Sequence, residues 1–374
     1  MSLLDATQKS DTLRGKVAIV GIGEVPTRRV IPGRTMYGLN AEAAKMAIAD
    51  AGLTKQDING LITDGSAALA TMAEYIGIRP TFATGVSMQG ASGASATTVA
   101  ASAINAGLAD TILIVMGNSR IDRAAGGTPG PSVRSEWEDS YGPAAGAGTG
   151  YALIYNRHMY EFGTTQEQMA KLAEDQRFNA QYNENAVFHG QPASKSDVLE
   201  SRYINYPLRI LETVMPCDGA AALVMTRADR AKSFPHRPVY LLGAGMEQSN
   251  ANIWQTDRIT TTPVRVSASR AFQMSGYGPQ DMQFAEFYDC YTILVAVTLE
   301  DAGFVKKGEI GPFYESTDTT YKGSFPINTD GGQLSGGQPG LAGGFRHVIE
   351  GVRQIMGRAG ERQVALNDLC MVNG

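Results

Sequence analysis

Residues 275–289 read SGYGPQDMQFAEFYD, and residues 51–64 read AGLTKQDINGLITD, with the same features in the same order. Each stretch contains the end of a helix, a glycine, a Gln-Asp pair and then a strand. The glycines, Gly52 and Gly276, are 224 positions apart, and the Gln-Asp pairs have the same spacing. This agreement predicts that the chain contains one structural plan twice.

Other segments extend the repeat. VAIVGIGEVP at 17–26 reads as a buried strand that runs into a glycine turn, and VYLLGAGMEQ at 239–248 repeats it 222 positions later. Glycine-rich loops at 88–96 and 331–344 each lead into a helix and a strand. Each half therefore reads strand, helix, strand, glycine loop, helix, strand, which predicts a mostly parallel sheet covered by helices.

The repeat also predicts the domain organisation. We expect a first half at 1–232 and a second half at 233–374. The first half includes an aromatic, loop-rich insertion at 119–215 before a strand at 220–226 closes it. The second half stops at Gly374 without a counterpart of that strand. A last strand is therefore expected to be missing, and truncation is favoured over a dispensable strand.

Composition excludes several classes of function. The chain has 32 basic and 37 acidic side chains that are well mixed, so no basic stripe is available for nucleic acid. No apolar run is long enough for a secretion signal or a membrane span. Three cysteines, Cys217, Cys290 and Cys370, lie far apart, which favours a reducing, cytoplasmic setting. The four histidines lack metal-ligand spacing, so no metal site is expected in this chain.

The strand that ends at Tyr288-Asp289-Cys290-Tyr291 is the main candidate for chemistry. A phenol, a carboxylate and a thiol in consecutive positions can move protons. They can also have purely structural roles, because tyrosine favours strands and cysteine is often a small buried residue. The residues alone leave both interpretations open.

Three segments carry a resemblance to a known family. AEFYDCYT at 285–292, DGAAA at 218–222 and NTDGGQLSGGQPG at 328–340 resemble the thiolase superfamily, most closely its sterol-carrier-protein-type branch. The resemblance covers nearly the whole chain. It implies an α/β thiolase fold: duplicated, mixed halves in a five-layered αβαβα arrangement, with a loop insertion in the first half.

Three departures from the family pattern alter the implied chemistry. Thiolases of this kind place a nucleophilic cysteine at the N-terminus of the central helix, where the helix dipole lowers the thiol pKa. Here the matching position is Gly90. The family's two histidines correspond to Tyr288 and Gln338. Without the thiol and both imidazoles, acyl transfer through an acyl-enzyme lacks an evident agent.

These losses resemble those of the bacterial aldolases that shorten steroid side chains. The resemblance implies retro-aldol cleavage of a β-hydroxyacyl-CoA, with a steroid or other bulky side chain, to a ketone or aldehyde and a shorter acyl-CoA. Tyr288 would exchange the proton of the substrate hydroxyl, and Cys290 would return a proton to the α carbon. The residues expected to bind substrate or stabilise an oxyanion are Gln338, Gly337, Gly90 and Ser92.

Two of these positions carry further expectations. We interpret Ser92 as a helix N-cap, because no histidine is placed by sequence to activate it as a nucleophile. Gln338 stands where the related aldolases often have a second tyrosine. An amide can hydrogen-bond an oxygen but cannot exchange a proton at neutral pH.

The resemblance also implies partners. We expect a homodimer, joined through an edge strand near residues 81–90, and a small zinc-ribbon/OB-fold (DUF35-type) protein that completes an α2β2 complex in the bacterial cytoplasm. The insertion would be a lid over substrate, a dimer-packing region or both. No cofactor is expected in this chain: the CoA thioester is substrate, and zinc belongs to the partner. The alternatives are a thiolase-type acyltransferase or condensing enzyme, and a non-catalytic scaffold that binds acyl-CoA or lipid.

Overall fold

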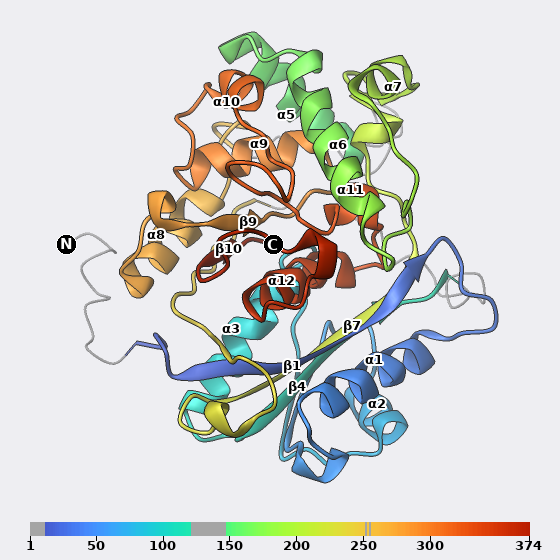
Figure 1. The fold of residues 1–374 in the computed structure, drawn as a ribbon, viewed down its shortest axis with the longest axis vertical. Helices are drawn as coiled ribbons and strands as arrows, with labels where there is room; N and C mark the ends of the chain where they lie inside the picture. The colour runs from blue at the N-terminus through green and yellow to red at the C-terminus, as the bar shows by residue number, and fades with distance from the viewer. Residues whose placement is uncertain (1–11, 121–146, 251–252, 254–255) are drawn as a thin grey trace.

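The computed structural model describes residues 12–120, 147–250, 253 and 256–374 (Figure 1). Part of the expected insertion, residues 121–146, lies outside this range. The elements before it are β1 (Val17–Arg28), α1 (Met36–Asp50), β2 (Gly60–Thr63), α2 (Leu69–Ile76), β3 (Phe82–Gly85), α3 (Ser92–Asn105) and β4 (Thr111–Asn118). The insertion contributes α5 (Ala147–Phe162), α6 (Gln166–Gln181), α7 (Lys195–Glu200), β5 (Tyr203–Asn205) and β6 (Leu208–Arg209), and β7 (Asp218–Arg227) follows it.

The second half begins after β7. Its elements are β8 (Val239–Tyr240), α8 (Val264–Ser275), β9 (Phe284–Glu286), α9 (Thr292–Asp301), α10 (Ile310–Ser316), α11 (Gly332–Gly336), α12 (Ala342–Ile355) and β10 (Cys370–Val372). Figure 1 shows the layers: α1 and α2, the large sheet, α3 with α12, the small β9–β10 sheet, and α8 and α9 beyond it. The layered α/β thiolase fold is therefore confirmed.

The large sheet has the strand order β3-β2-β4-β7-β1-β8. β2 is parallel to β3 and β4, whereas β7 is antiparallel to both β4 and β1. The prediction of a mostly parallel sheet was therefore wrong, and the sheet is mixed, as the family resemblance implies. The cause is β7, which enters between β4 and β1 after the insertion and runs opposite to both. β3 lies at the edge, as expected of residues 81–90.

Glycines explain why the two halves share one sequence pattern. A Cβ on Gly21 or Gly23 would lie 2.6 or 2.4 Å from a carbonyl oxygen of α1. A Cβ on Gly243 or Gly245 would lie 2.1 or 2.0 Å from a carbonyl oxygen of α8. In both halves the first extended segment therefore lies directly on a helix, which only glycine permits.

The two halves differ in strand pairing. The strand expected at 239–248 is only β8, so this prediction was wrong in extent. β8 pairs antiparallel with β1 of the large sheet. The hydrogen bonds of Leu241 go to Gly15 and Val17, and residues 241–250 are in no strand. β9 and β10 pair in parallel, with Cys370 opposite Phe284. That the second half lacks a last strand stays a prediction.

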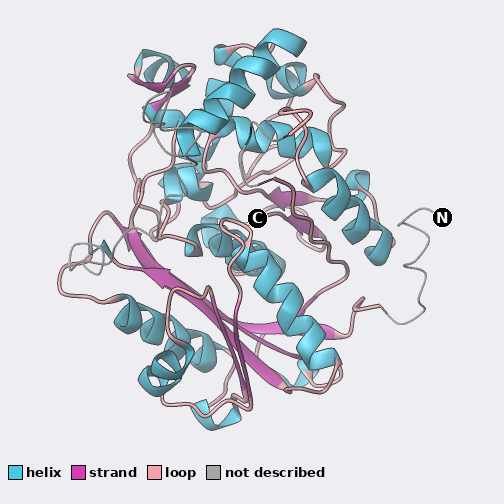
Figure 2. Ribbon diagram, turned by 180° about the vertical axis from the view of Figure 1, so that it is seen from behind, coloured by secondary structure: helices cyan, strands magenta, loops and turns pink. Residues whose placement is uncertain are grey.

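The two central helices meet at their N-termini. A Cβ on Gly93 of α3 would lie 2.5 Å from the Cα of Phe345 in α12, and one on Gly344 would lie 2.0 Å from the carbonyl oxygen of Gly90. Glycine therefore lets the backbones touch. Seen from behind, these helices cross between the large sheet and the β9–β10 pair (Figure 2). Their meeting point places two positive helix ends together.

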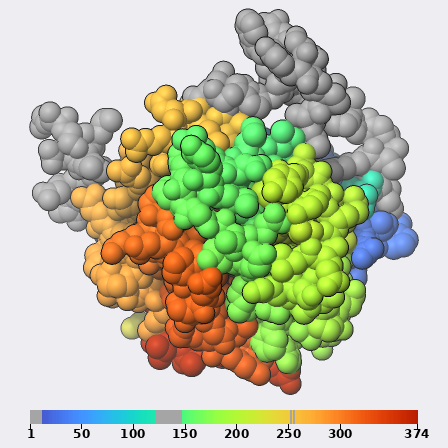
Figure 3. Space-filling model, turned by 90° about the horizontal axis from the view of Figure 1, so that it is seen from above, coloured from blue at the N-terminus to red at the C-terminus, as the bar shows by residue number. Residues whose placement is uncertain are grey.

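The upper face is built from the insertion and the second half. Figure 3 shows α5 to α7 (green) beside the segment that contains α10 (orange). One apolar cluster joins the two parts and includes Tyr155 of α5, Leu172 of α6, and Phe287 and Ile293 of the second half. Among the described residues, no helix combines the length and the apolar character that crossing a bilayer requires.

Candidate active site

Three chain segments converge beside the N-termini of α3 and α12. They are the turn after β9 at 287–291, the loop before α3 at 88–91 and the glycine loop at 336–340. In the turn, Phe287, Asp289 and Cys290 are buried, whereas Tyr288 stays partly exposed. Tyr288 is therefore accessible to a substrate, as is Tyr291 at the end of the turn.

The ring of Tyr288 fills the space beside Gly90. A Cβ built on Gly90 would lie 2.2 Å from Cζ of Tyr288 and 2.6 Å from its hydroxyl oxygen. Side-chain atoms never approach this closely without displacing a neighbour. The phenol therefore stands where a cysteine side chain at position 90 would have to stand, and the two cannot coexist in this arrangement.

The hydroxyl of Tyr288 has one defined partner. Nε2 of Gln338 donates a hydrogen bond to it over 3.1 Å. Burial raises the pKa of Tyr288 well above its ordinary value, and negative charge on Cys290 or Asp289 would raise it further. The phenol is therefore protonated at neutral pH, and it can donate its proton while it accepts another.

Asp289 anchors the turn to the glycine loop. Its Oδ1 accepts from the backbone N–H of Gln333 over 2.8 Å, and its Oδ2 accepts from that of Leu334 over 3.2 Å. These are N–H groups in the first turn of α11, which lack partners inside the helix. A Cβ on Gly332 would lie 2.1 Å from Oδ2, so only glycine leaves room for the carboxylate. Asp289 thereby fixes its neighbour Tyr288 relative to Gln338.

His347 lies beneath the turn and was not identified from the sequence. Its Nε2 is 3.1 Å from Oδ1 of Asp289, and its ring centre is 6.4 Å from that of Tyr288. Burial favours the neutral imidazole, but hydrogen bonds and charge from Asp289 and Glu286 outweigh it and raise the pKa of His347 to about 9. The sequence contains one signal that could have pointed to this helix. Charged residues recur every three or four positions along α12, at Arg346, Glu350 and Arg353, and in the structure most of this helix is buried, so these charges need buried partners.

Asn328 holds the strand that carries Tyr288. Its Oδ1 accepts from the N–H of Phe287 over 2.7 Å, and its Nδ2 donates to the carbonyl of Phe287 over 2.9 Å. The side chain thus continues the hydrogen bonding that residues 326–328 make with Ala285. Asn328 has φ of +50°, a conformation that asparagine tolerates better than most residues. Sequence analysis assigned this residue no role beyond its place in the family motif.

Two further residues that were predicted for the site, Cys290 and Gly337, lie in the turn after β9 and in the glycine loop. Cys290 is 6% exposed and follows Tyr288 by two residues. The N–H of Gly337 donates to Gln333 and its carbonyl accepts from Arg346, so its backbone groups already have partners within the loop. A role for Gly337 in oxyanion binding stays a prediction.

Ser92 supports the loop before α3. It is fully buried, and its hydroxyl accepts from the N–H of Met88 over 2.9 Å and donates to the carbonyl of Gln89 over 2.6 Å. The N-cap of α3 is Ala91, so the prediction that Ser92 is the N-cap was wrong. The reason is that its hydroxyl bonds back to the preceding loop. Its predicted substrate contact stays untested by this geometry.

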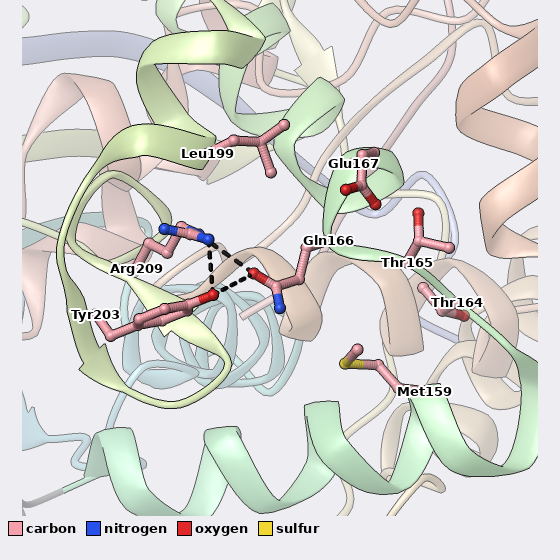
Figure 4. Close-up of a pocket in the computed structure, with 8 residues that line it drawn as sticks. All are labelled: Met159, Thr164, Thr165, Gln166, Glu167, Leu199, Tyr203 and Arg209. Carbon is pink, nitrogen blue, oxygen red and sulfur yellow. Dashed lines mark hydrogen bonds between the residues drawn. The ribbon is translucent and has the colours of Figure 1, made fainter.

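Two pockets lie apart from these segments. One, of about 330 Å³, opens at the start of α6, where Oε1 of Gln166 accepts from the hydroxyl of Tyr203 and from Nε of Arg209 (Figure 4). The other, of about 460 Å³, is lined by residues that include Glu24 and Arg353. Neither contains Tyr288, Gly90 or Gln338. In the second pocket Glu24 and Arg353 form an ion pair, and in the first Arg209 donates to the hydroxyl of Tyr203.

Comparisons with known proteins give a consistent result. The family model described as "Thiolase C-terminal domain-like" matches residues 245–374. An acetyl-CoA acetyltransferase of Methanothermobacter thermautotrophicus is 32% identical over 365 residues, which is 93% of each chain. A steroid side-chain-cleaving aldolase of Thermomonospora curvata is 31% identical, over 92% of this chain and 91% of its own. A solved structure described as "Ltp2-ChsH2(DUF35) aldolase" superposes with a TM-score of 0.84 at 28% identity, and covers 93% of this chain and 92% of that chain.

Proposed function

This chain belongs to the thiolase superfamily, and we propose that it is an aldolase that cleaves a β-hydroxyacyl-CoA between its α and β carbons. The observation that carries the proposal is the position of Tyr288. Its ring fills the space where an acyl-accepting thiol at position 90 would stand. A proton-exchanging group thus replaces a nucleophile on the same scaffold.

The reaction needs two proton transfers and one electron sink. The β-hydroxyl loses its proton as the bond between the α and β carbons breaks, and the β carbon becomes the carbonyl of a ketone or aldehyde. The electron pair of the broken bond moves into the thioester as an enolate. The enolate then takes a proton at its α carbon, which gives the shorter acyl-CoA. No electron donor or acceptor is consumed.

Tyr288 is suited to receive the first proton. It is a partly exposed acid–base group whose oxygen is held by Gln338. A phenol that keeps its own proton at neutral pH can accept the substrate's proton only as it gives its own to a neighbour, so a relay is required.

The enolate oxygen has favourable surroundings. The N-termini of α3 and α12 meet beside Tyr288, and their partial positive charges favour an anion there. Donors that are fixed in advance around a developing oxyanion typically contribute about a hundredfold or more in rate each. The backbone around Gly90 and the second N–H of Gln338 are the candidates in this chain.

The test is product analysis with a β-hydroxyacyl-CoA that carries a bulky side chain, and with the partner protein present. We expect a carbonyl product and a shorter acyl-CoA in equal amounts, without consumption of free CoA. Tyr288→Phe should lower kcat by about 10²- to 10⁴-fold. Tyr75→Phe, which removes an exposed hydroxyl elsewhere, is the matched control. Unchanged turnover in Tyr288→Phe would remove this residue from the reaction.

Acyl transfer is the second candidate, because one relative is named an acetyl-CoA acetyltransferase. It predicts that free CoA is consumed and that an acyl group can be trapped on a side chain during turnover. The third candidate, a scaffold without activity, predicts acyl-CoA binding and no conversion. The occupied space beside Gly90 disfavours acyl transfer.

The proposal also covers the class of substrate and the partner proteins. The relatives named above support a steroid or similarly bulky acyl group. A solved neighbour whose name includes a DUF35 component supports a DUF35-type partner. We propose that this partner is a small zinc-ribbon/OB-fold protein that holds the zinc, and that this chain binds no cofactor. We propose a cytoplasmic α2β2 complex built on a homodimer. Co-expression followed by light scattering and zinc analysis of the separated subunits tests it, and a lone monomer with full activity would contradict it.

A further inference from the structure

In the proposed aldolase reaction, on which this inference rests, no residue has yet been assigned to restore the proton that Cys290 gives up. A proton must reach the α carbon, and Cys290 was expected to supply it. A buried thiol that gives up its proton needs a neighbour that restores it. Gln338 cannot serve, because an amide does not exchange protons at neutral pH. The neighbours of Cys290 are therefore the place to search.

Tyr151 of α5 comes from the insertion and reaches the catalytic turn. Its ring centre lies 4.7 Å from that of Tyr291, with the ring planes 31° apart. One turn earlier in the helix, a Cβ on Gly148 would lie only 3.3 Å from the hydroxyl of Tyr291. The absence of a side chain at Gly148 thus lets α5 lie close to the turn. Tyr151 itself is partly exposed.

Tyr151 also interacts with Cys290. Burial raises the pKa of the Cys290 thiol well above its ordinary value, and a hydrogen bond from Tyr151 opposes that rise. Conversely, negative charge on Cys290 is the largest cause that raises the pKa of Tyr151, and charge on Tyr288 adds to it. Together with the packing of Tyr151 on Tyr291, this interaction places Tyr151 beside the turn that carries Tyr288 and Cys290.

The other tyrosines of α5 do not share this position. Tyr155 lies one turn further along and is fully buried, and its hydroxyl has no hydrogen-bond partner among the described residues. Tyr160 is 82% exposed and stacks under Arg157. Only Tyr151 combines contact with the catalytic turn and access from outside.

We infer that Tyr151 is a proton-relay residue that acts through Cys290 during carbon–carbon cleavage. The substrate hydroxyl gives its proton to Tyr288, which releases its own proton to water at its exposed side, and Tyr151 takes up a proton from water. Tyr151 passes its own proton to Cys290 as the Cys290 S–H proton bonds to the α carbon of the enolate. One proton leaves the β oxygen and one reaches the α carbon, so every residue ends the turnover neutral.

This relay suits the surroundings of the three groups. Each has a pKa that burial or neighbouring charge raises, so an isolated phenolate or thiolate would be costly. Proton transfers between neutral groups and water avoid any such intermediate. It also gives the insertion a chemical role, since α5 is the element that brings Tyr151 to the site.

The experiment compares Tyr151→Phe with Tyr160→Phe in the full complex. Cleavage of the β-hydroxyacyl-CoA is measured by carbonyl release. Exchange of the α hydrogens of propionyl-CoA with D₂O is measured separately by mass spectrometry. We expect Tyr151→Phe to lower both kcat and exchange by about 10- to 100-fold, with KM within about twofold and the melting temperature unchanged. Tyr160→Phe should match the wild type.

The outcomes separate the inference from the proposed function. Wild-type protein that cleaves no β-hydroxyacyl-CoA would overturn the aldolase proposal itself. Wild-type cleavage with an undiminished kcat in Tyr151→Phe would overturn only the relay. A loss of kcat that is explained by a lower melting temperature would also overturn the relay, because it indicates a structural role. A loss of kcat with α exchange at the wild-type rate would overturn it too, because the relay predicts that both rates fall.

Discussion

The Tyr288 ring lies where a side chain on Gly90 would lie, with Cζ only 2.2 Å from the position of the missing Cβ. Position 90 precedes the helix α3, and position 288 follows the strand β9 of the other half. The absence of a side chain at position 90 and the presence of a large ring at position 288 therefore depend on each other, because both would occupy the same space. This coupling is measurable without knowledge of the substrate.

Gly90→Ala should displace the phenol. The added methyl overlaps the ring, so we expect a loss of about 1–3 kcal/mol in unfolding free energy and a kcat that falls at least tenfold. In a Tyr288→Ala background the ring is absent, and Gly90→Ala should cost almost nothing. Chemical denaturation of the four variants gives the coupling energy. Additive costs would show that the two side chains do not compete for one space.

Gln338→Leu should weaken catalysis without unfolding the protein. It removes the donor that lies 3.1 Å from the hydroxyl of Tyr288, and that hydrogen bond alone contributes about 1 kcal/mol, so kcat should fall at least about fivefold. A fall of about a hundredfold or more is expected where the second N–H of Gln338 also binds the enolate oxygen. Gln338→Glu keeps the size but replaces the donor with an acceptor, so it should be at least as slow. Steady-state kinetics on both variants decide this. Full activity in Gln338→Glu would contradict the donor role.

Asn328→Ala should destabilise the turn that carries Tyr288. The buried N–H and C=O of Phe287 would both lose their partner, and alanine would have to adopt φ of +50°. The expected loss is roughly 2–5 kcal/mol, measured by denaturant titration. Asn328→Gly relieves only the backbone strain and should be less damaging by about 1 kcal/mol. Equal costs for the two variants would mean that strain at this position is negligible.

The stability of the protein should fall between pH 7 and 9 because of His347. The pKa of His347 is about 9 in the folded state against 6.5 for an unperturbed histidine, so the folded protein holds this proton more tightly. The part of the unfolding free energy that comes from protonated His347 is fully present below about pH 6.5 and is lost as the pH rises through about 9. Glu286, whose pKa burial raises to about 7, titrates mainly below this window.

His347→Gln provides the control for this prediction. Glutamine keeps a donor toward Asp289 but carries no titrating proton, so its melting temperature should stay nearly flat from pH 7 to 9. Thermal melts of both proteins across the range test the assignment. A wild-type decline that persists in His347→Gln would assign the titration to another group.

The family motifs predicted part of the candidate site from the sequence. They identified Gly90, Tyr288 and Gln338 as the changed positions, and the structure brings these three together. They did not reveal Asp289 as an anchor or His347 as its partner. Those roles depend on α11 and α12, which follow the turn by more than forty residues. Tyr151 lies within the predicted aromatic insertion, but nothing in its neighbourhood along the chain points toward Cys290.

The repeat was predictable because its signals are local. Glycines at 21–23 and 243–245 must recur wherever an extended segment lies directly on a helix, and buried strands such as β4 must be apolar along their whole length. The prediction of strand 239–248 failed because strand formation also needs a partner. The hydrogen bonds of Leu241 go to Gly15 and to Val17 at the start of β1, and no pattern within 239–248 indicates where that pairing ends.

The amino-acid order alone determined the duplication, the layered α/β class and the absence of a thiol before α3, since each depends on residue types at short, regular spacings. Only the three-dimensional packing decided that the phenol of Tyr288 takes the vacated space, that His347 supports it through Asp289, and that α5 brings Tyr151 to Cys290. Contacts between distant segments depend on how helices and sheets stack, and stacking depends on the whole core rather than on any one stretch of chain.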